Sequence, residues 1–304
     1  MFSPKGLCLL FIMLELGLAD HLQSRYGMSL NGVVLLSSLL DFRTLGGSEG
    51  DDLTSIIYLP IFAAVAPHHG KVERDFQKLM ADARSYANGD YATHLLRGTD
   101  LHAGAREETA VKLSQLTGIS TQIWLETDLR LSPTRFRKEL LREEGKVLGR
   151  FDARVAWNAK SKDSDYASYD PSYSVAYGAF STAMLDYLTT DLGWEEHSPY
   201  EILTGKVHPW NWGAKNGIVN VSSRLSNAMV QNPKLRVLVM CGHTDLATPP
   251  SAIEHSFRHM LSLPKDQRAQ VEFDYYAAGH MFYLNEPDLA KMRVDLLEFL
   301  NPTP

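Results

Sequence analysis

The sequence predicts an α/β protein in which a parallel β-sheet carries an inserted, mainly helical cap. Three apolar runs have the pattern of strands buried on both faces: Asn31–Leu36, Leu235–Met240 and Gln270–Tyr276. Helical patterns dominate between the first and second runs, from about Leu53 to Val230. Because buried strands that alternate with helices form parallel sheets, we expect the cap to lie over the carboxyl ends of the strands, where such sheets bind ligands.

The elements follow one another in a simple order. A short amphipathic helix over Leu16–Tyr26 ends at Gly27, and the first strand is followed by a Gly-rich acidic loop at Arg43–Asp52. The cap is predicted to hold no strands and to contain helices at Val72–Ala87, Arg106–Gln115, Pro133–Glu143, Ser181–Leu192 and Val221–Val230. Further helices are expected at Ser251–Leu261 and Asp288–Leu300. The chain therefore divides into the start of a core at 1–52, a cap at 53–230 and the rest of the core at 231–304.

Length and charge narrow the function classes. The chain has 304 residues, 44% of them hydrophobic, which is enough to bury a sizeable core. With 30 basic and 36 acidic residues the net charge is −6, so nothing favours binding to nucleic acid. Two cysteines, Cys8 and Cys241, cannot form a disulfide framework.

The first residues contain an apolar run, Leu7–Leu14, that is too short to span a bilayer. We therefore expect no stable membrane anchor. The run resembles the core of a signal peptide, with Gly17 and Ala19 as small residues near a possible cleavage position. A buried strand or the first turns of a buried helix would have the same pattern.

Two residues with catalytic chemistry follow consecutive predicted strands. Asp245 comes just after the second strand, and His280 just after the third. Acid then base is the order of a hydrolase triad in which a nucleophilic serine comes first. An imidazole is needed to take the proton of the serine hydroxyl, and a carboxylate fixes the imidazole tautomer. Taken singly, each residue has an ordinary structural explanation, as a loop cap for Asp245 and a structural histidine for His280.

The surrounding motifs resemble those of a known family. Gly242–Pro249 and Ala278–Tyr283 are similar to the acid and base motifs of the serine carboxypeptidases, in their bacterial branch. Asn31–Leu35, Tyr86–Tyr91 and Gly149–Arg154 resemble other parts of the same family. The resemblance implies an α/β-hydrolase-type sheet, with Asp245 as the triad acid and His280 as the base. It also implies hydrolysis of peptide or protein C-termini through an acyl-enzyme, a periplasmic or extracellular location, and no metal or cofactor.

The family's nucleophile elbow, Gly-Glu-Ser-Tyr-Gly, has no match here. No serine stands between Ser3 and Ser24, and the N-terminal strands of the family have no counterpart. We therefore expect the C-terminal portion of a serine carboxypeptidase, inactive as this chain. An export signal is doubtful, because cleavage after Ala19 would cut into the helix that matches the family. The alternatives are a non-catalytic, hydrolase-like module that binds a peptide or a partner, and a chain that does not fold stably because its sheet edges are exposed.

Other candidate nucleophiles are weak. Gly46–Gly50 fits the G-x-S-x-G pattern around Ser48, but an elbow needs a strand directly before it and a helix directly after it. Acidic neighbours of Ser48 would also oppose a developing oxyanion. Cys8 lies in an apolar run, which keeps a thiol protonated.

Two groups of side chains have structural explanations that compete with functional ones. The histidine pairs His68–His69 and His255/His259 lack a third ligand at motif spacing, so no metal site is expected. A tyrosine patch at positions 166, 169, 173 and 177 could line a peptide groove or pack in the cap.

Overall fold

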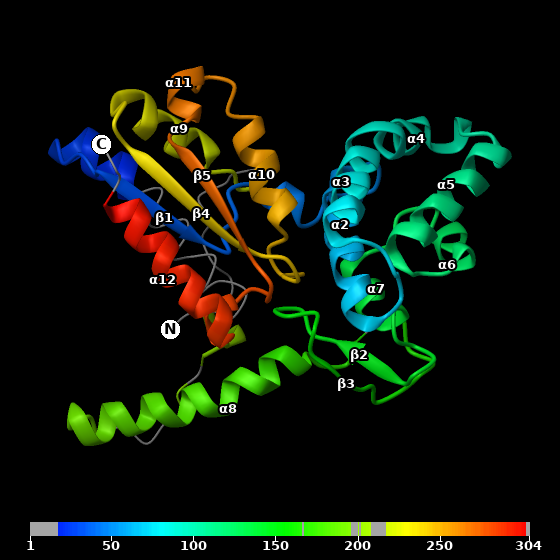
Figure 1. Ribbon diagram of the computed structural model, residues 1–304. Helices are drawn as coiled ribbons and strands as arrows, with labels where there is room; N and C mark the ends of the chain where they lie inside the picture. Colours follow the sequence, from blue (N-terminus) through cyan, green and yellow to red (C-terminus); the bar gives the residue numbers. More distant parts are fainter. Residues whose placement is uncertain (1–17, 166, 196–199, 201, 208–216, 302–304) are drawn as a thin grey trace.

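The computed structural model describes residues 18–165, 167–195, 200, 202–207 and 217–301 (Figure 1). It is a mixed α/β structure whose larger sheet has three parallel strands in the order β1-β4-β5. These strands are β1 (Gly32–Leu36), β4 (Arg236–Gly242) and β5 (Val271–Tyr276). The three predicted strands and their parallel arrangement are thus confirmed.

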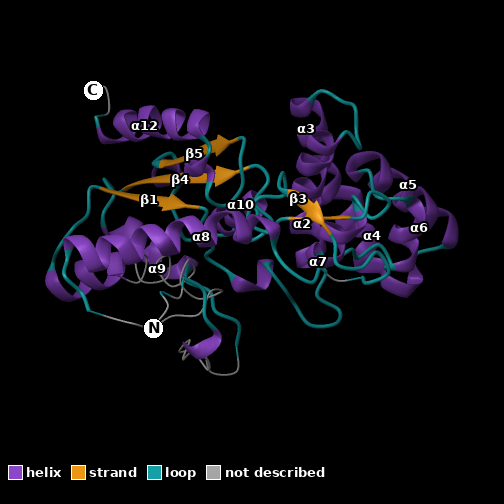
Figure 2. Ribbon diagram, turned by 90° about the horizontal axis from the view of Figure 1, so that it is seen from below, coloured by secondary structure: helices purple, strands orange, loops and turns teal. Residues whose placement is uncertain are grey.

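Helices cover both faces of this sheet, which explains why its strands are apolar throughout (Figure 2). On one face, Val237 and Val239 pack with side chains of α9 (Ser222–Gln231) and α10 (Pro250–Arg258). On the other face, Leu238 and Met240 pack with α12 (Glu286–Leu300). The two-residue period of β4 thus assigns alternate side chains to two separate cores.

The helices of the insertion are α2 (Leu53–Val65), α3 (Phe76–Tyr86), α4 (Ala92–Arg97), α5 (Ala103–Thr117), α6 (Thr121–Glu126), α7 (Pro133–Glu139) and α8 (Pro171–Asp186). Helices α2 to α7 lie to the right of the sheet in Figure 1, with α8 below it, and the insertion has a further core to which Leu39, Leu246 and Ala252 also contribute. A short helix α11 (Lys265–Arg268) precedes β5. Residues 18–26 are helical and end at Gly27, whose φ of +66° suits glycine.

Helix α2 was not predicted, although it is the most buried helix of the insertion. Side chains from Ile57 to Val65 are all buried, so the helix has no polar face to give a 3.6-residue pattern. Pro60 inside the helix also argues against a helix in the sequence. The ring of Phe62 stacks on Phe136 of α7 with 4.0 Å between centroids, which joins α2 to the rest of the insertion core.

Two further expectations about the insertion were wrong. It contains a two-stranded antiparallel sheet of β2 (Lys146–Leu148) and β3 (Ala156–Asn158), which is too short to give a strand pattern. The helix expected at Ser181–Leu192 begins ten residues earlier, at Pro171, because the Asp170 side chain caps it by accepting from the backbone N–H groups of Ser172 and Tyr173. Its α-helical part ends at Asp186.

Candidate active site

Asp245 is placed by the turn that follows β4. Its side chain is fully buried, and its Oδ1 accepts hydrogen bonds from the backbone N–H groups of Ala247 at 2.8 Å and Thr248 at 2.9 Å. Because two backbone donors hold one carboxylate oxygen, the other oxygen, Oδ2, has a fixed direction. A buried carboxylate that carries this many hydrogen bonds is satisfied as an anion.

His280 meets that second oxygen. The residue lies in the loop after β5 and is 5% exposed, and its Nδ1 is 2.8 Å from Oδ2 of Asp245. A carboxylate only accepts hydrogen bonds, so the proton of a neutral imidazole sits on Nδ1 and Nε2 becomes the basic nitrogen. The structure therefore brings together the two residues that the sequence singled out.

Two residues that the sequence did not single out hold this pair. The hydroxyl of Thr248 lies 2.7 Å from Asp245 Oδ2 and 3.0 Å from His280 Nδ1, and it is 2.8 Å from the carbonyl oxygen of Ser37. The hydroxyl of Ser37 donates to the carbonyl oxygen of His280 at 2.7 Å. Ser37 has a φ of +44°, a conformation that serine rarely adopts. In the sequence, only its position directly after the first strand indicates that Ser37 lies near the candidate site.

The insertion reaches the pair through its segment 149–153, defined here as the junction segment. The backbone N–H of His280 donates to the carbonyl oxygen of Phe151 at 2.5 Å, and the N–H of Ala153 donates to Thr244 at 3.0 Å. A Cβ on Gly279 would lie 2.1 Å from the oxygen of Phe151, and one on Gly242 would lie 2.1 Å from the oxygen of Gly279. Only glycines at these two positions let the three backbone segments approach so closely.

Aromatic rings continue outward from the imidazole. The ring of Phe151 lies 5.3 Å from that of His280, Tyr173 follows Phe151 at 6.5 Å, and Tyr177 follows Tyr173 at 5.1 Å. Of the predicted tyrosine patch, Tyr173 and Tyr177 thus lie together on α8. Tyr169 instead donates to the carbonyl oxygen of Asn158, and position 166 lies outside the described residues.

A buried tyrosine of α2, Tyr58, also lies near Asp245. The hydroxyl of Tyr58 in α2 donates to the carbonyl oxygen of Leu246 at 3.2 Å. Burial first, and the charge of Asp245 second, raise the pKa of Tyr58 far above its usual range. Tyr58 is therefore a neutral hydrogen-bond donor at neutral pH.

Ser48 lies in an exposed loop, away from any elbow. The strand before it ends at Leu36 and the next α-helix begins at Leu53, so neither flanks the serine directly. Cys8 falls outside the described residues, and Cys241 is buried in β4, where burial raises the pKa of its thiol.

The histidine pairs form no metal cluster. In the described part of the chain, no group of three or more His, Cys, Asp or Glu side chains is placed to hold a metal ion. His255 and His259 instead face each other, with ring centroids 3.9 Å apart. His69 lies 2.7 Å from the carbonyl oxygen of Ala153, at the junction segment.

Comparisons with known proteins found no relative of this chain. No family model matches the chain, and neither a curated protein nor a solved structure matches it. Among the described helices, none is both long enough and apolar enough to cross a bilayer.

Proposed function

We propose that the chain carries the acid and base of a serine-type carboxypeptidase site on an α/β-hydrolase-type core. In this proposal Nε2 of His280 accepts the proton of a serine hydroxyl, and Asp245 orients the imidazole and stabilises the imidazolium that forms. The observation that carries the proposal is the buried Asp245–His280 hydrogen bond of 2.8 Å at the carboxyl ends of neighbouring parallel strands.

A cation beside the pair suits a substrate with a free C-terminus. The guanidinium of Arg150 lies over the ring of Phe151, 4.6 Å from its centroid, and that ring packs against His280. Among the described residues, the carboxylate oxygen nearest to the Arg150 guanidinium is on Asp170, 3.9 Å from Nε, which is too far for a good hydrogen bond. We propose that Arg150 attracts the terminal carboxylate of a peptide, a group that guanidinium donors bind strongly. A periplasmic or extracellular location remains part of the proposal.

No serine among the described residues stands in a strand–turn–helix elbow, so we expect this chain to bind peptides without cleaving them. The same observation favours the second candidate, a non-catalytic module that binds a peptide or a partner. Fluorophosphonate labelling located by mass spectrometry separates the two. An adduct on a serine that disappears in His280→Ala would establish a working triad. A chain that unfolds cooperatively and forms no adduct would support the non-catalytic binding module.

Peptide binding can be tested without any cleavage. We expect an N-blocked dipeptide with a free carboxylate to bind about tenfold more tightly than its amide, as charge-assisted hydrogen bonds predict. Arg150→Gln should remove that preference, whereas Arg293→Gln on α12 should keep it. Equal affinity of the wild-type chain for acid and amide would contradict the proposed recognition of C-termini.

A further inference from the structure

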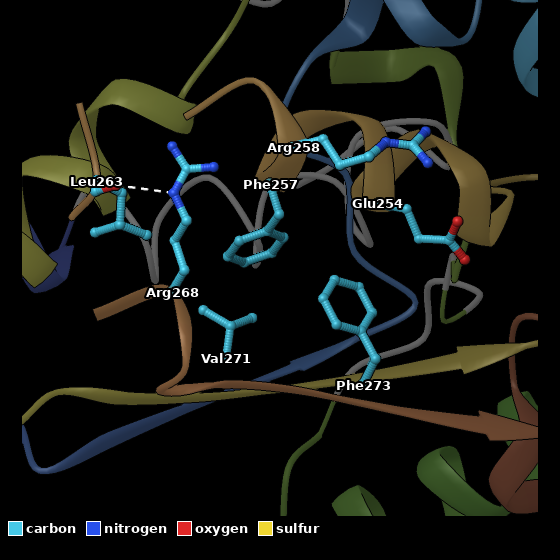
Figure 3. A pocket seen from close by; sticks show the side chains of 7 residues that line it. All are labelled: Glu254, Phe257, Arg258, Leu263, Arg268, Val271 and Phe273. Carbon is cyan, nitrogen blue, oxygen red and sulfur yellow. Dashed lines mark hydrogen bonds between the residues drawn. The ribbon is translucent and has the colours of Figure 1, made fainter. Parts of the chain in front are cut away.

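The structure contains a cavity of about 330 Å³ away from the Asp245–His280 pair. It opens where α10 and the loop after it pack on β5, the last described strand of the sheet (Figure 3). Its lining is formed by Glu254, Phe257, Arg258, Leu263, Arg268, Val271 and Phe273. A volume of this size lies at the lower end of the range of small-molecule sites.

The floor of the cavity is apolar. The rings of Phe257 and Phe273 meet edge to face with 5.5 Å between centroids, and Val271 lies beside them (Figure 3). Val271 and Phe273 are alternate residues of β5 and therefore share one face of the strand. A ligand lying on this floor finds no polar side chain there, so its contacting part must be a hydrocarbon.

The ends of the cavity carry charge, and two of its three charged side chains are already engaged. Glu254 accepts from Arg84 at 2.9 Å and from the hydroxyl of Tyr275 at 2.8 Å. Arg268 donates to the backbone carbonyl oxygens of Leu263 and Met260, which fixes its side chain in the turn before β5.

Arg258 differs from both. It is exposed at the end of α10 and makes no hydrogen bond or ion pair with any described residue. Figure 3 shows the Arg268 side chain on one side of Phe257 and the Arg258 guanidinium on the other, towards the side of Glu254. Burial lowers the pKa of the neighbouring His255 to about 4, so that histidine is uncharged at neutral pH. Arg268 uses two of its five N–H donors in its bonds to backbone carbonyl oxygens, whereas the guanidinium of Arg258 donates none of its five to any described residue. Arg258 is therefore the charged group of the lining with the most hydrogen-bond donors to offer a ligand.

We propose that this cavity binds a small amphipathic carboxylate, of the class of medium-chain fatty acids, with its hydrocarbon tail on Phe257, Phe273 and Val271 and its carboxylate on Arg258. A hydrocarbon tail fits because the floor has no polar side chain to pair with the amide groups of a peptide. The carboxylate fits because a guanidinium binds it through two parallel hydrogen bonds. This site is independent of the proposed peptidase function.

Titration calorimetry of the full chain with octanoate tests the proposal, with 1-octanol as a ligand of equal tail length and no charge. We expect octanoate to bind at least tenfold more tightly than 1-octanol. Arg258→Gln should bring the octanoate affinity down to that of 1-octanol. Arg293→Gln, which removes the same charge from an exposed position of α12 on the opposite side of the sheet, should leave the affinity unchanged.

A second variant tests the cavity itself. Val271→Trp should fill the floor and weaken the binding of both ligands at least tenfold, and unchanged thermal unfolding would show that the variant is folded. The proposal is overturned if octanoate does not bind, if it binds no better than 1-octanol, or if Arg258→Gln or a folded Val271→Trp binds it as well as the wild type. Preferential binding of an extended peptide along β5 in place of octanoate would also overturn it.

Discussion

The insertion meets the rest of the chain in two very different ways. At the junction segment, backbone packs against backbone so closely that no Cβ fits on Gly279 or Gly242. Along α8, by contrast, most side chains after Ala176 are exposed, including Phe180 and Met184. The difference teaches where positioning and recognition can lie: the junction, which Ser172 at the start of α8 also contacts, fixes His280, whereas the part of α8 after Ala176 leaves aromatic side chains exposed.

The largest expected effect on stability is that of a Gly→Ala substitution at the junction, compared with a Gly→Ala substitution in α8. Gly279→Ala places a Cβ 2.1 Å from the Phe151 oxygen, so a backbone segment must move and the free energy of unfolding should fall by about 3 kcal/mol or more. Gly178→Ala in α8 meets no atom within 4 Å and should stabilise the chain by about 0.5–1 kcal/mol, as expected for alanine in a helix.

Urea unfolding of both glycine variants measures the contrast. Similar small effects at the two positions would show that the junction is as loosely packed as α8.

Asp245→Asn should have the next largest effect. An asparagine can still accept from the N–H groups of Ala247 and Thr248, but its amide nitrogen would then face Nδ1 of His280. The imidazole should switch to the tautomer with the proton on Nε2, and replacing a hydrogen bond to a charged carboxylate by a neutral one should lower the free energy of unfolding by about 2 kcal/mol. The ¹⁵N chemical shifts of the imidazole report the tautomer, and shifts that do not change in the variant would contradict the assigned hydrogen bond.

Thr248→Val tests the positioning hydroxyl at nearly constant volume. The variant loses the contacts to Asp245 and to the carbonyl oxygen of Ser37, so the free energy of unfolding should fall by about 1–2 kcal/mol. Thr248→Ser keeps the hydroxyl and serves as the matched control. If valine and serine destabilise equally, the hydroxyl has no role in holding the pair.

The smallest expected effect concerns pH. Burial, and then the charge of Arg84, lower the pKa of His243 to about 4, below the unfolded value of about 6.5. The unfolded chain therefore binds more protons between these values, and stability falls as pH drops from about 6.5 towards 4. We expect this histidine to contribute about 1 kcal/mol to the difference between pH 7 and pH 5, after allowance for its partial exposure.

Melting temperatures of the wild type and His243→Gln at the two pH values measure this contribution. The variant should show a shallower pH dependence, with a remainder from His255, whose pKa is also lowered to about 4. An equally steep dependence in the variant would show that His243 is not protected from protonation.

The sequence predicted the parallel strands and the pair of candidate residues because both leave local signals. Continuous apolar runs mark strands buried on two faces, and the residues directly after such strands share one edge of the sheet. Helix α2 gave no signal because it is apolar on every side. The Ser37 hydroxyl and the Phe151 carbonyl oxygen contact the backbone of His280 across 243 and 129 positions of the chain, and no local pattern encodes such contacts. The cavity beside β5 arises in the same way, from residues on α10, α11 and β5 whose spacing carries no motif.

The central claim is that Nε2 of His280 is a base within a peptide-binding site. It can be tested without a nucleophilic serine by alkylation with an N-blocked amino-acid chloromethyl ketone, in which chloride leaves as the carbon bonds to an unprotonated imidazole nitrogen. Mass spectrometry should find the adduct on His280 in the wild type, and its formation should slow at least tenfold in Asp245→Asn while exposed histidines such as His102 react equally in both. A folded chain that reacts at its exposed histidines but not at His280, or that reacts at His280 equally fast in Asp245→Asn, would contradict the claim.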